Sequence, residues 1–127
     1  MDKDELRKKL TPEEYMVTQE KGTERPFSNQ YWDMHEDGMY YCKVCDTALF
    51  SSDAKYDSGT GWPSFFSSIA SETIKTITDS SLGVDRTEII CAHCGSHLGH
   101  VFDDGPKEKG GKRFCTNSAS LSFKKKS

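Results

Sequence analysis

Four of the five cysteines in this 127-residue sequence form two C-x-x-C pairs, and the fifth stands alone. Two such pairs supply four thiolates, which is the ligand set of a structural zinc ion in tetrahedral coordination. A zinc ion with four protein ligands has no open position, so it stabilises a fold and leaves the chemistry to other groups. The expected ligands are Cys42, Cys45, Cys91 and Cys94, and the remaining cysteine is Cys115.

Two other uses of the C-x-x-C pairs are less compatible with the sequence. A redox pair of thioredoxin type needs its nucleophilic cysteine at the start of a helix, whereas both pairs here are flanked by strand-like sequence. Structural disulfides would not persist in a reducing compartment. His93 lies inside the second pair and could replace one cysteine as a ligand. With four thiolates present, we expect His93 to face solvent.

The unpaired cysteine is a nucleophile, a buried apolar side chain or a residue without a role, and its neighbours favour the first reading. Residues two apart on a strand share a face, so Arg113, Cys115 and Asn117 should point the same way. A guanidinium favours the thiolate, which is the attacking species, and an amide can donate a hydrogen bond to an oxygen of the group attacked. A lone cysteine on a strand is more often core filler, but an Arg, Cys and Asn face is poorly suited to an apolar core.

Two further segments carry side chains that a scaffold alone does not need. In the segment SGTGWPSF, glycines and a proline present Trp62 on a tight loop, although a tryptophan beside a turn is often part of the core. His97 and His100 lie three residues apart and precede the acidic turn that contains Asp104. One histidine alone is usually structural, but two histidines near carboxylates could act as acid, hydrogen-bond donor or ligand.

Composition limits the class of protein. The length and the 34% hydrophobic content fit a single domain, expected over residues 4–126. The net charge of −3 argues against nucleic-acid binding, and we interpret the basic run at 124–126 as a solvated tail. No apolar stretch is long enough for a membrane span or resembles a signal peptide, and the acidic N-terminus does not resemble a transit peptide. By default, these absences predict a cytoplasmic protein that does not contact a membrane.

The elements that must position these residues are predicted to be helices followed by strands. Leu6 and Leu10 mark one helical stripe, and Thr11-Pro12-Glu13-Glu14 predicts a capping box at the start of a second helix that ends near Lys21-Gly22. After residue 38, short strand-like runs alternate with glycine-rich breaks and predict an antiparallel all-β domain. The expected strands are 39–41, 48–50, 64–66, 73–78, 86–91, 98–102, 112–115 and 119–123, the last with alternating apolar and polar residues.

The two cysteine pairs also share a short internal similarity. Cys42-x-x-Cys45-Asp46-Thr47 parallels Cys91-x-x-Cys94-Gly95-Ser96, with a turn-favouring residue after each second cysteine. This pattern is typical of paired zinc knuckles and is too short to indicate a duplicated domain.

Taken together, these segments resemble the methionine-(R)-sulfoxide reductases. The likeness covers nearly the whole chain; it includes Gly22-Thr23-Glu24-x-Pro26-Phe27, Tyr56-Asp57-Ser58-Gly59-x-Gly61-Trp62-Pro63-Ser64-Phe65 and Ser96-His97-Leu98-Gly99-His100-Val101-Phe102. The resemblance implies a mainly β fold of two antiparallel sheets, of β-tent type, with short N-terminal helices and one structural zinc ion. It also implies thiol-dependent reduction of methionine-(R)-sulfoxide, mainly in oxidised proteins, without bound flavin or nicotinamide. We expect a monomer.

The resemblance also implies roles for individual residues. Cys115 attacks the sulfoxide sulfur and is left as a sulfenic acid, while Trp62 packs against the substrate methyl group and selects one epimer. His100 is expected to donate the proton, and Asp104 to orient His100. His97 and Asn117 are expected to contact the substrate oxygen or a bridging water. Arg113 is expected to stabilise the thiolate.

One position departs from a pattern common among relatives, which have a second, recycling cysteine between the two glycines before Trp62. This chain has Thr60 there, and threonine cannot form a disulfide. We therefore expect an external thiol, from thioredoxin, a glutaredoxin system or a small molecule, to reduce the oxidised Cys115. The less favoured alternative is a zinc cysteine that resolves the sulfenic acid and releases the metal. The competing functional class is a zinc-ribbon-like binding domain in which Cys115 is inert.

Overall fold

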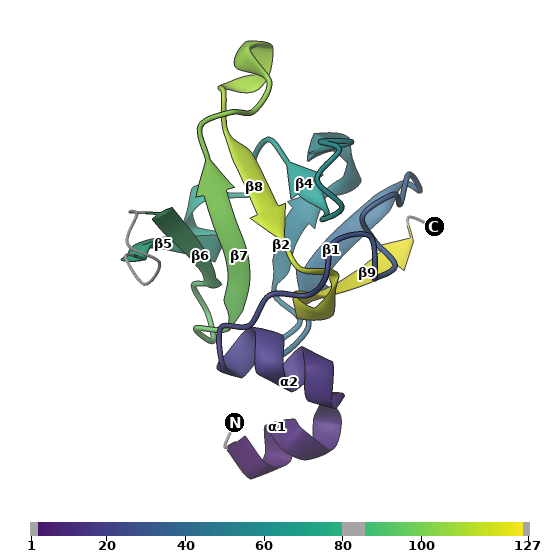
Figure 1. Ribbon diagram of the computed structural model, residues 1–127, viewed down its shortest axis with the longest axis vertical. Coiled ribbons are helices and arrows are strands. Elements are labelled where there is room, and N and C mark those ends of the chain that lie inside the picture. Colours follow the sequence, from purple (N-terminus) through teal and green to yellow (C-terminus); the bar gives the residue numbers. More distant parts are fainter. Residues whose placement is uncertain (1–2, 80–85, 126–127) are drawn as a thin grey trace.

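The computed structural model describes residues 3–79 and 86–125 (Figure 1). Two helices, α1 (Lys3–Lys9) and α2 (Pro12–Gln19), lie together at one end of the molecule, and the loop that joins β7 to β8 lies at the opposite end. The predicted capping box at α2 is confirmed. The Thr11 hydroxyl accepts the N–H of Glu14 at 3.1 Å, and the Glu14 carboxylate accepts the N–H of Thr11 at 2.9 Å.

The C-terminal end of α2 differs from the expected glycine stop. The residue in the left-handed conformation is Lys21, with φ of 57°, and the N–H of Gly22 then donates to the Met16 carbonyl at 3.0 Å. Glycine follows at position 22 for lack of space and not for its conformation, because a Cβ there would lie 2.9 Å from Met16 Cγ. The chain leaves the helix in a direction that carries residues 23–27 toward the sheets.

The strands form two antiparallel sheets, which confirms the expected fold class. The three-stranded sheet has the order β2-β1-β9, and the six-stranded sheet has the order β3-β4-β8-β7-β6-β5. The strands are β1 (Gly38–Cys42), β2 (Ala48–Ser51), β3 (Lys55–Tyr56), β4 (Ser64–Phe65), β5 (Ile74–Asp79), β6 (Arg86–Cys91), β7 (His97–Phe102), β8 (Arg113–Thr116) and β9 (Leu121–Lys125).

The prediction for the last strand was wrong at its start. Residue 119 lies in a 3-10 turn, η4 (Ser118–Ser120), and β9 begins only at Leu121. Ser120 is fully buried, so the apolar and polar alternation does not extend through this turn. β3 was not predicted, because two residues carry too little pattern to be recognised. Lys126 of the basic C-terminal run lies outside the described residues.

The core is packed between the two sheets. Phe50 of the three-stranded sheet stacks on Phe65 of the six-stranded sheet, with ring centroids 4.3 Å apart and an interplanar angle of 14°. Tyr40 meets Phe65 edge-on at 5.1 Å, and all three rings are fully buried. This contact holds β4, and with it β8, against the other sheet. Among the described residues, neither helix has the length and apolar character to cross a membrane.

Candidate active site and metal centre

Cys115 lies on β8 between two antiparallel neighbours. It pairs with His100 of β7 on one side and with Ser64 of β4 on the other. β7 and β8 run side by side through the middle of the molecule (Figure 1). Only glycine fits at position 99, because a Cβ there would overlap the carbonyl oxygen of Cys115. This close approach of the two strands fixes His100 beside the candidate nucleophile.

A cavity of about 180 Å³ opens over β8. Arg113, Cys115 and Asn117, which were predicted to share a face, all line it, although Thr116 lines it too and Asn117 follows the end of β8. Trp62 and His100 line the same cavity, which therefore combines an aromatic wall with polar groups around one sulfur atom. The other lining residues are Thr23, Thr60, Arg86, Gly99, Phe102 and Thr116.

Two opposing effects act on the Cys115 thiol. Burial is the largest effect and raises its pKa, as do the charges of Glu24 and Asp104, whereas the charge and hydrogen bonding of Arg113 lower the pKa. The net direction is upward, which is opposite to the depressed pKa that the Arg113 neighbour suggested. The reason is that the sulfur is half-buried in a sheet, where desolvation disfavours the thiolate.

Asp104 holds the guanidinium of Arg113 in place. The Arg113 Nε donates to Asp104 Oδ1 at 2.9 Å, and Nη2 donates to Oδ2 at 3.3 Å. The guanidinium also lies over the Phe102 ring, 4.4 Å from its centroid. The hydrogen bond from Arg113 lowers the pKa of the Asp104 carboxyl, so the pair persists into the acid range. The structure thus gives Asp104 a role toward Arg113, while its expected role toward His100 stays a prediction.

His97 lies behind His100, and among the described residues it is not part of the cavity lining. It is 3% exposed, and its ring meets that of His100 edge-on at 5.6 Å. Alternation along a strand would place these residues on opposite faces, but the register with β6 shifts at this point and leaves Leu98 as an extra residue. The expected contact of His97 with the substrate oxygen or a bridging water stays a prediction.

The buried carboxylate of Glu88 on β6 was not recognised in the sequence as part of the site. Its Oε2 lies 2.8 Å from His97 Nδ1, and its Oε1 accepts from Lys21 Nζ at 3.2 Å. Burial lowers the pKa of His97, although the hydrogen bond and charge of Glu88 act in the opposite direction, so the imidazole is neutral near pH 7. The signal available in the sequence was an acid directly before the apolar pair Ile89 and Ile90.

Glu24 was also missed, although its segment carries part of the family resemblance. The Trp62 Nε1–H donates to the Glu24 carbonyl at 3.0 Å, and the Glu24 N–H donates to Asn117 Oδ1 at 3.0 Å. Asn117 Nδ2 donates to the carbonyl of Leu98 at 3.1 Å. One N–H of the Asn117 amide remains for a ligand in the cavity.

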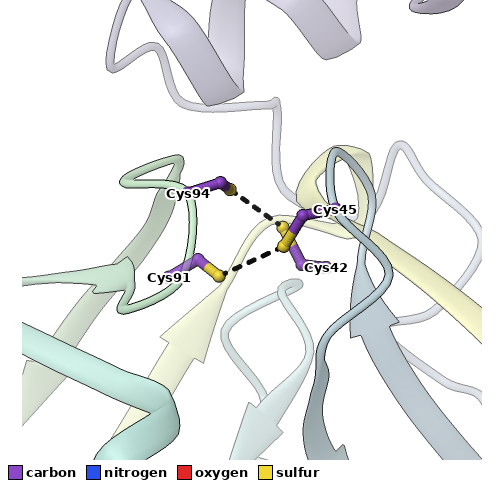
Figure 2. A group of neighbouring side chains, drawn as sticks. All are labelled: Cys42, Cys45, Cys91 and Cys94. Atoms are coloured by element: carbon purple, nitrogen blue, oxygen red, sulfur yellow. Dashed lines mark hydrogen bonds between the residues drawn. The ribbon is translucent and has the colours of Figure 1, made fainter. Parts of the chain in front are cut away.

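The four paired cysteines gather at a single point between the sheets (Figure 2). Their Sγ atoms lie within 4.8 Å of one another, and the distances from Cys42 to Cys94 and from Cys45 to Cys91 are both 3.6 Å. Zn–S bonds of about 2.3 Å give a tetrahedron with S···S edges of about 3.8 Å, so the donor set and its spacing fit a zinc ion.

The internal similarity of the two pairs corresponds to two matching turns. Asp46 and Gly95 occupy the left-handed conformation, with φ of 61° and 79°, and each donates its N–H to the first cysteine carbonyl of its pair, at 2.9 and 2.8 Å. The hydroxyl oxygens of Thr47 and Ser96 lie 3.1 Å from Cys45 Sγ and Cys94 Sγ. Equivalent turns on the two sheets thus present the four sulfurs to one another.

Comparison with known proteins shows what this chain is similar to. The model of the SelR domain matches residues 10–125. A peptide methionine sulfoxide reductase MsrB of Burkholderia thailandensis is 54% identical over 122 residues, covering 96% of this chain and 85% of that protein. The corresponding MsrB of a Synechococcus species is 58% identical over 120 residues, covering 94% and 88%. Mouse methionine-R-sulfoxide reductase B3, mitochondrial, is 56% identical over 119 residues, covering 94% of this chain and 47% of that protein.

A solved structure of more distant sequence shares only the fold. The crystal structure of the Mis18 'Yippee-like' domain superposes with a TM-score of 0.57 at 14% sequence identity, covering 72% of this chain and 99% of that chain. Similarity at this level of identity says nothing about chemistry.

Proposed function

This chain belongs to the family defined by the SelR domain, the peptide methionine-(R)-sulfoxide reductases, and we propose that its substrate is methionine-(R)-sulfoxide in oxidised proteins, with Cys115 as the nucleophile. The observation that carries this assignment is the position of the unpaired cysteine. Cys115 lies in a cavity between the aromatic face of Trp62 and the polar groups of His100, Arg113 and Asn117.

Binding places the pyramidal sulfur of the sulfoxide over Cys115. The substrate methyl group packs on the Trp62 ring, which is held by its N–H···O hydrogen bond to the Glu24 carbonyl. The free N–H of Asn117 then donates to the sulfoxide oxygen. Because the methyl, the oxygen and the rest of the side chain must each occupy a separate region, only one epimer presents its sulfur to the thiolate.

The chemical step transfers oxygen from substrate to enzyme. The Cys115 thiolate attacks the sulfoxide sulfur, and His100 protonates the oxygen. This attack forms a bond between the two sulfurs, and the protonated oxygen then passes to the Cys115 sulfur as the substrate S–O bond and the sulfur–sulfur bond break. Methionine leaves, and Cys115 becomes a sulfenic acid, which is two electrons more oxidised than the thiol. Arg113 lowers the cost of forming the thiolate against the opposing effect of burial. Glu88 holds the His97 ring by a hydrogen bond, and the His97 ring in turn packs edge-on against His100 and keeps it in place.

Regeneration uses an external thiol. Thr60 lines the cavity where a recycling cysteine would have to lie, and its hydroxyl is 2.8 Å from that of Ser58. Two external thiols therefore reduce the sulfenic acid to thiol, with release of water and formation of their disulfide. Thioredoxin, a glutaredoxin system or a small thiol can supply these electrons, and such a cycle suits the cytoplasm.

Zinc, when bound at the four paired cysteines, supplies structural cross-linking and takes no part in the reaction. Cys42 and Cys45 would hold it from the β1–β2 turn, and Cys91 and Cys94 from the β6–β7 turn. Both turns lie outside the cavity lining described above.

The test is an assay of both sulfoxide epimers in peptides, with a dithiol as reductant. Wild-type protein should reduce the R epimer only. The Cys115→Ser variant should have no activity, with its zinc content and melting temperature close to wild type. Appreciable turnover by this variant, or equal reduction of both epimers by the wild type, would contradict the assignment.

A further inference from the structure

A buried carboxylate that is not itself among the described lining residues joins three segments of the cavity wall. Glu24 lies in the loop between α2 and β1 and is 2% exposed. Its Oε2 accepts the N–H of Ser118, and its Oε1 accepts the N–H of Ala119, both at 2.8 Å. Asn29 Nδ2 donates to Oε1 at 2.9 Å. The preceding residue, Thr23, lines the cavity directly.

These hydrogen bonds replace a cap that η4 does not make for itself. The first N–H groups of a helical turn have no partner within the turn, and an asparagine at the N-cap position usually accepts one of them. The N-cap residue of η4 is Asn117, and its side chain makes no capping hydrogen bond. Glu24 supplies the acceptors instead, from 94 residues away along the chain. The Asn117 amide is therefore available to the cavity, two residues after Cys115.

The main chain of the same residue reaches the other side of the cavity. The Glu24 N–H donates to Asn117 Oδ1, and the Glu24 carbonyl accepts the indole N–H of Trp62, both at 3.0 Å. A second bond, from the N–H of Phe27 to the carbonyl of Gly61 at 2.8 Å, ties the same loop to the Trp62 turn. The segment 24–27 thus fixes the distance between Trp62, which is the aromatic wall of the cavity, and β8.

Stability alone does not account for a glutamate side chain at this place. A buried carboxylate is costly to desolvate, and a serine or aspartate next to the turn could cap it locally. We propose that Glu24 is a positioning residue, which holds Trp62 and Asn117 at the separation that a methionine sulfoxide side chain requires. This inference rests on the function proposed above.

The first experiment compares Glu24→Gln with Glu14→Gln. Glutamine has the same shape as glutamate but turns an NH2 group toward N–H donors, so one contact with η4 is lost and the loop shifts. We expect kcat/KM for the R-sulfoxide to fall about 10- to 100-fold, the range expected when a hydrogen bond to a charged group is lost, with part of the loss in KM. Glu14 also accepts a backbone N–H, at 2.9 Å, and it lies in the capping box of α2, so its variant controls for general loss of stability.

A spectroscopic readout separates positioning from stability and needs no substrate. In ¹H–¹⁵N spectra, the Trp62 indole resonance should move in Glu24→Gln and stay in place in Glu14→Gln, with the wild-type spectrum as the reference. Because this readout is independent of turnover, it distinguishes failure of this inference from failure of the proposed reaction. An unmoved Trp62 resonance, or a loss of activity that follows melting temperature equally in both variants, would overturn the inference.

Glu24→Asp keeps the test decisive if Glu24→Gln does not fold. Aspartate retains the charge but is shorter by one methylene group, so it cannot reach Ser118 and Ala119 without drawing the loop inward. The expected result is a folded protein with reduced kcat/KM and a displaced Trp62 resonance. Wild-type kinetics within twofold, together with an unmoved resonance, would leave the carboxylate with a structural role only.

Discussion

At the scale of single residues, the reactivity of Cys115 depends on two effects of opposite sign. Burial raises the pKa of the thiol and is the largest effect, Arg113 lowers it, and the net direction is upward. The thiolate is therefore a minor species at neutral pH, and labelling of the free enzyme should accelerate as pH rises toward the pKa of Cys115. The bidentate contact with Asp104 keeps the guanidinium where it opposes the desolvation of the sulfur.

Replacement of Arg113 by alanine should make the Cys115 thiol less acidic. The measurement is the rate of alkylation by iodoacetamide as a function of pH, read at Cys115 by mass spectrometry. Removal of a cation close to a thiolate raises its pKa by about one unit or more, so the midpoint should move upward and labelling at pH 7 should slow about tenfold. Lys112→Ala is the matched control, because Lys112 pairs with exposed Asp103. An unchanged midpoint in Arg113→Ala would show that the guanidinium does not act on the sulfur.

At the scale of elements, the β7–β8 pair brings the reacting groups together. The two strands approach so closely at Gly99 that no side chain fits between them, and this contact places His100 opposite Cys115. The shift in register between β6 and β7 then brings His97 to the same side as His100. The geometry of the site thus depends on one glycine and one irregularity in a strand.

Gly99→Ala should damage the site more than its effect on stability explains. The added methyl group forces β7 away from the Cys115 carbonyl, and such overpacking typically costs about 1–3 kcal/mol. Gly38→Ala provides the control, since a Cβ there would overlap the carbonyl oxygen of Lys124 in the other sheet. Both variants should melt at lower temperature by calorimetry, and only Gly99→Ala should lower kcat/KM in the folded enzyme. Equal activities at equal folded fractions would refute this role for Gly99.

At the scale of the whole molecule, the four cysteines join the two sheets. One pair lies at the β1–β2 turn of the three-stranded sheet, and the other at the β6–β7 turn of the six-stranded sheet (Figure 2). A zinc ion there closes a large loop of the chain and cross-links both layers of the fold. Apparent binding free energies of structural zinc are about 10–16 kcal/mol, which is as large as the stability of a typical domain.

Loss of one ligand should therefore unfold the protein before it affects catalysis. We expect Cys94→Ser to lose its zinc and most of its unfolding free energy, as measured by metal analysis and by thermal unfolding. Cys115→Ser is the matched control, because it removes a thiol that is not a ligand. A zinc-free Cys94→Ser protein that melts at the wild-type temperature would show that the metal centre is not required for the fold.

The sulfur chemistry of the whole chain predicts the product of a single turnover. Reduced protein treated with substrate in the absence of reductant should carry a sulfenic acid on Cys115 and four unmodified zinc cysteines, since Thr60 provides no second thiol. Mass spectrometry after sulfenic-acid trapping measures this. A disulfide between Cys115 and any zinc cysteine, formed at the rate of turnover, would instead support resolution by the metal centre.

The sequence alone was sufficient to predict the features that depend on local chemistry. The spacing Cys42–Cys45 and Cys91–Cys94 predicted the metal centre, the residues at the start of α2 predicted its capping box, and the alternate positions 113, 115 and 117 indicated side chains that line one cavity. These predictions succeed because ligand spacing, capping and strand periodicity depend on residues close together in the chain. The family resemblance added the reaction, which the comparisons support through relatives of 54–58% identity.

The tertiary structure alone decided the features that depend on distant residues. The direction of the Cys115 pKa shift depends on how deeply two sheets bury the sulfur, and the partner of Asp104 depends on the path of the β7–β8 loop. The carboxylate of Glu24 caps a turn 94 residues away, so no local pattern could assign its role. Burial and hydrogen bonds across such separations exist only after the chain has folded, and for this reason they could not be inferred from the order of the residues.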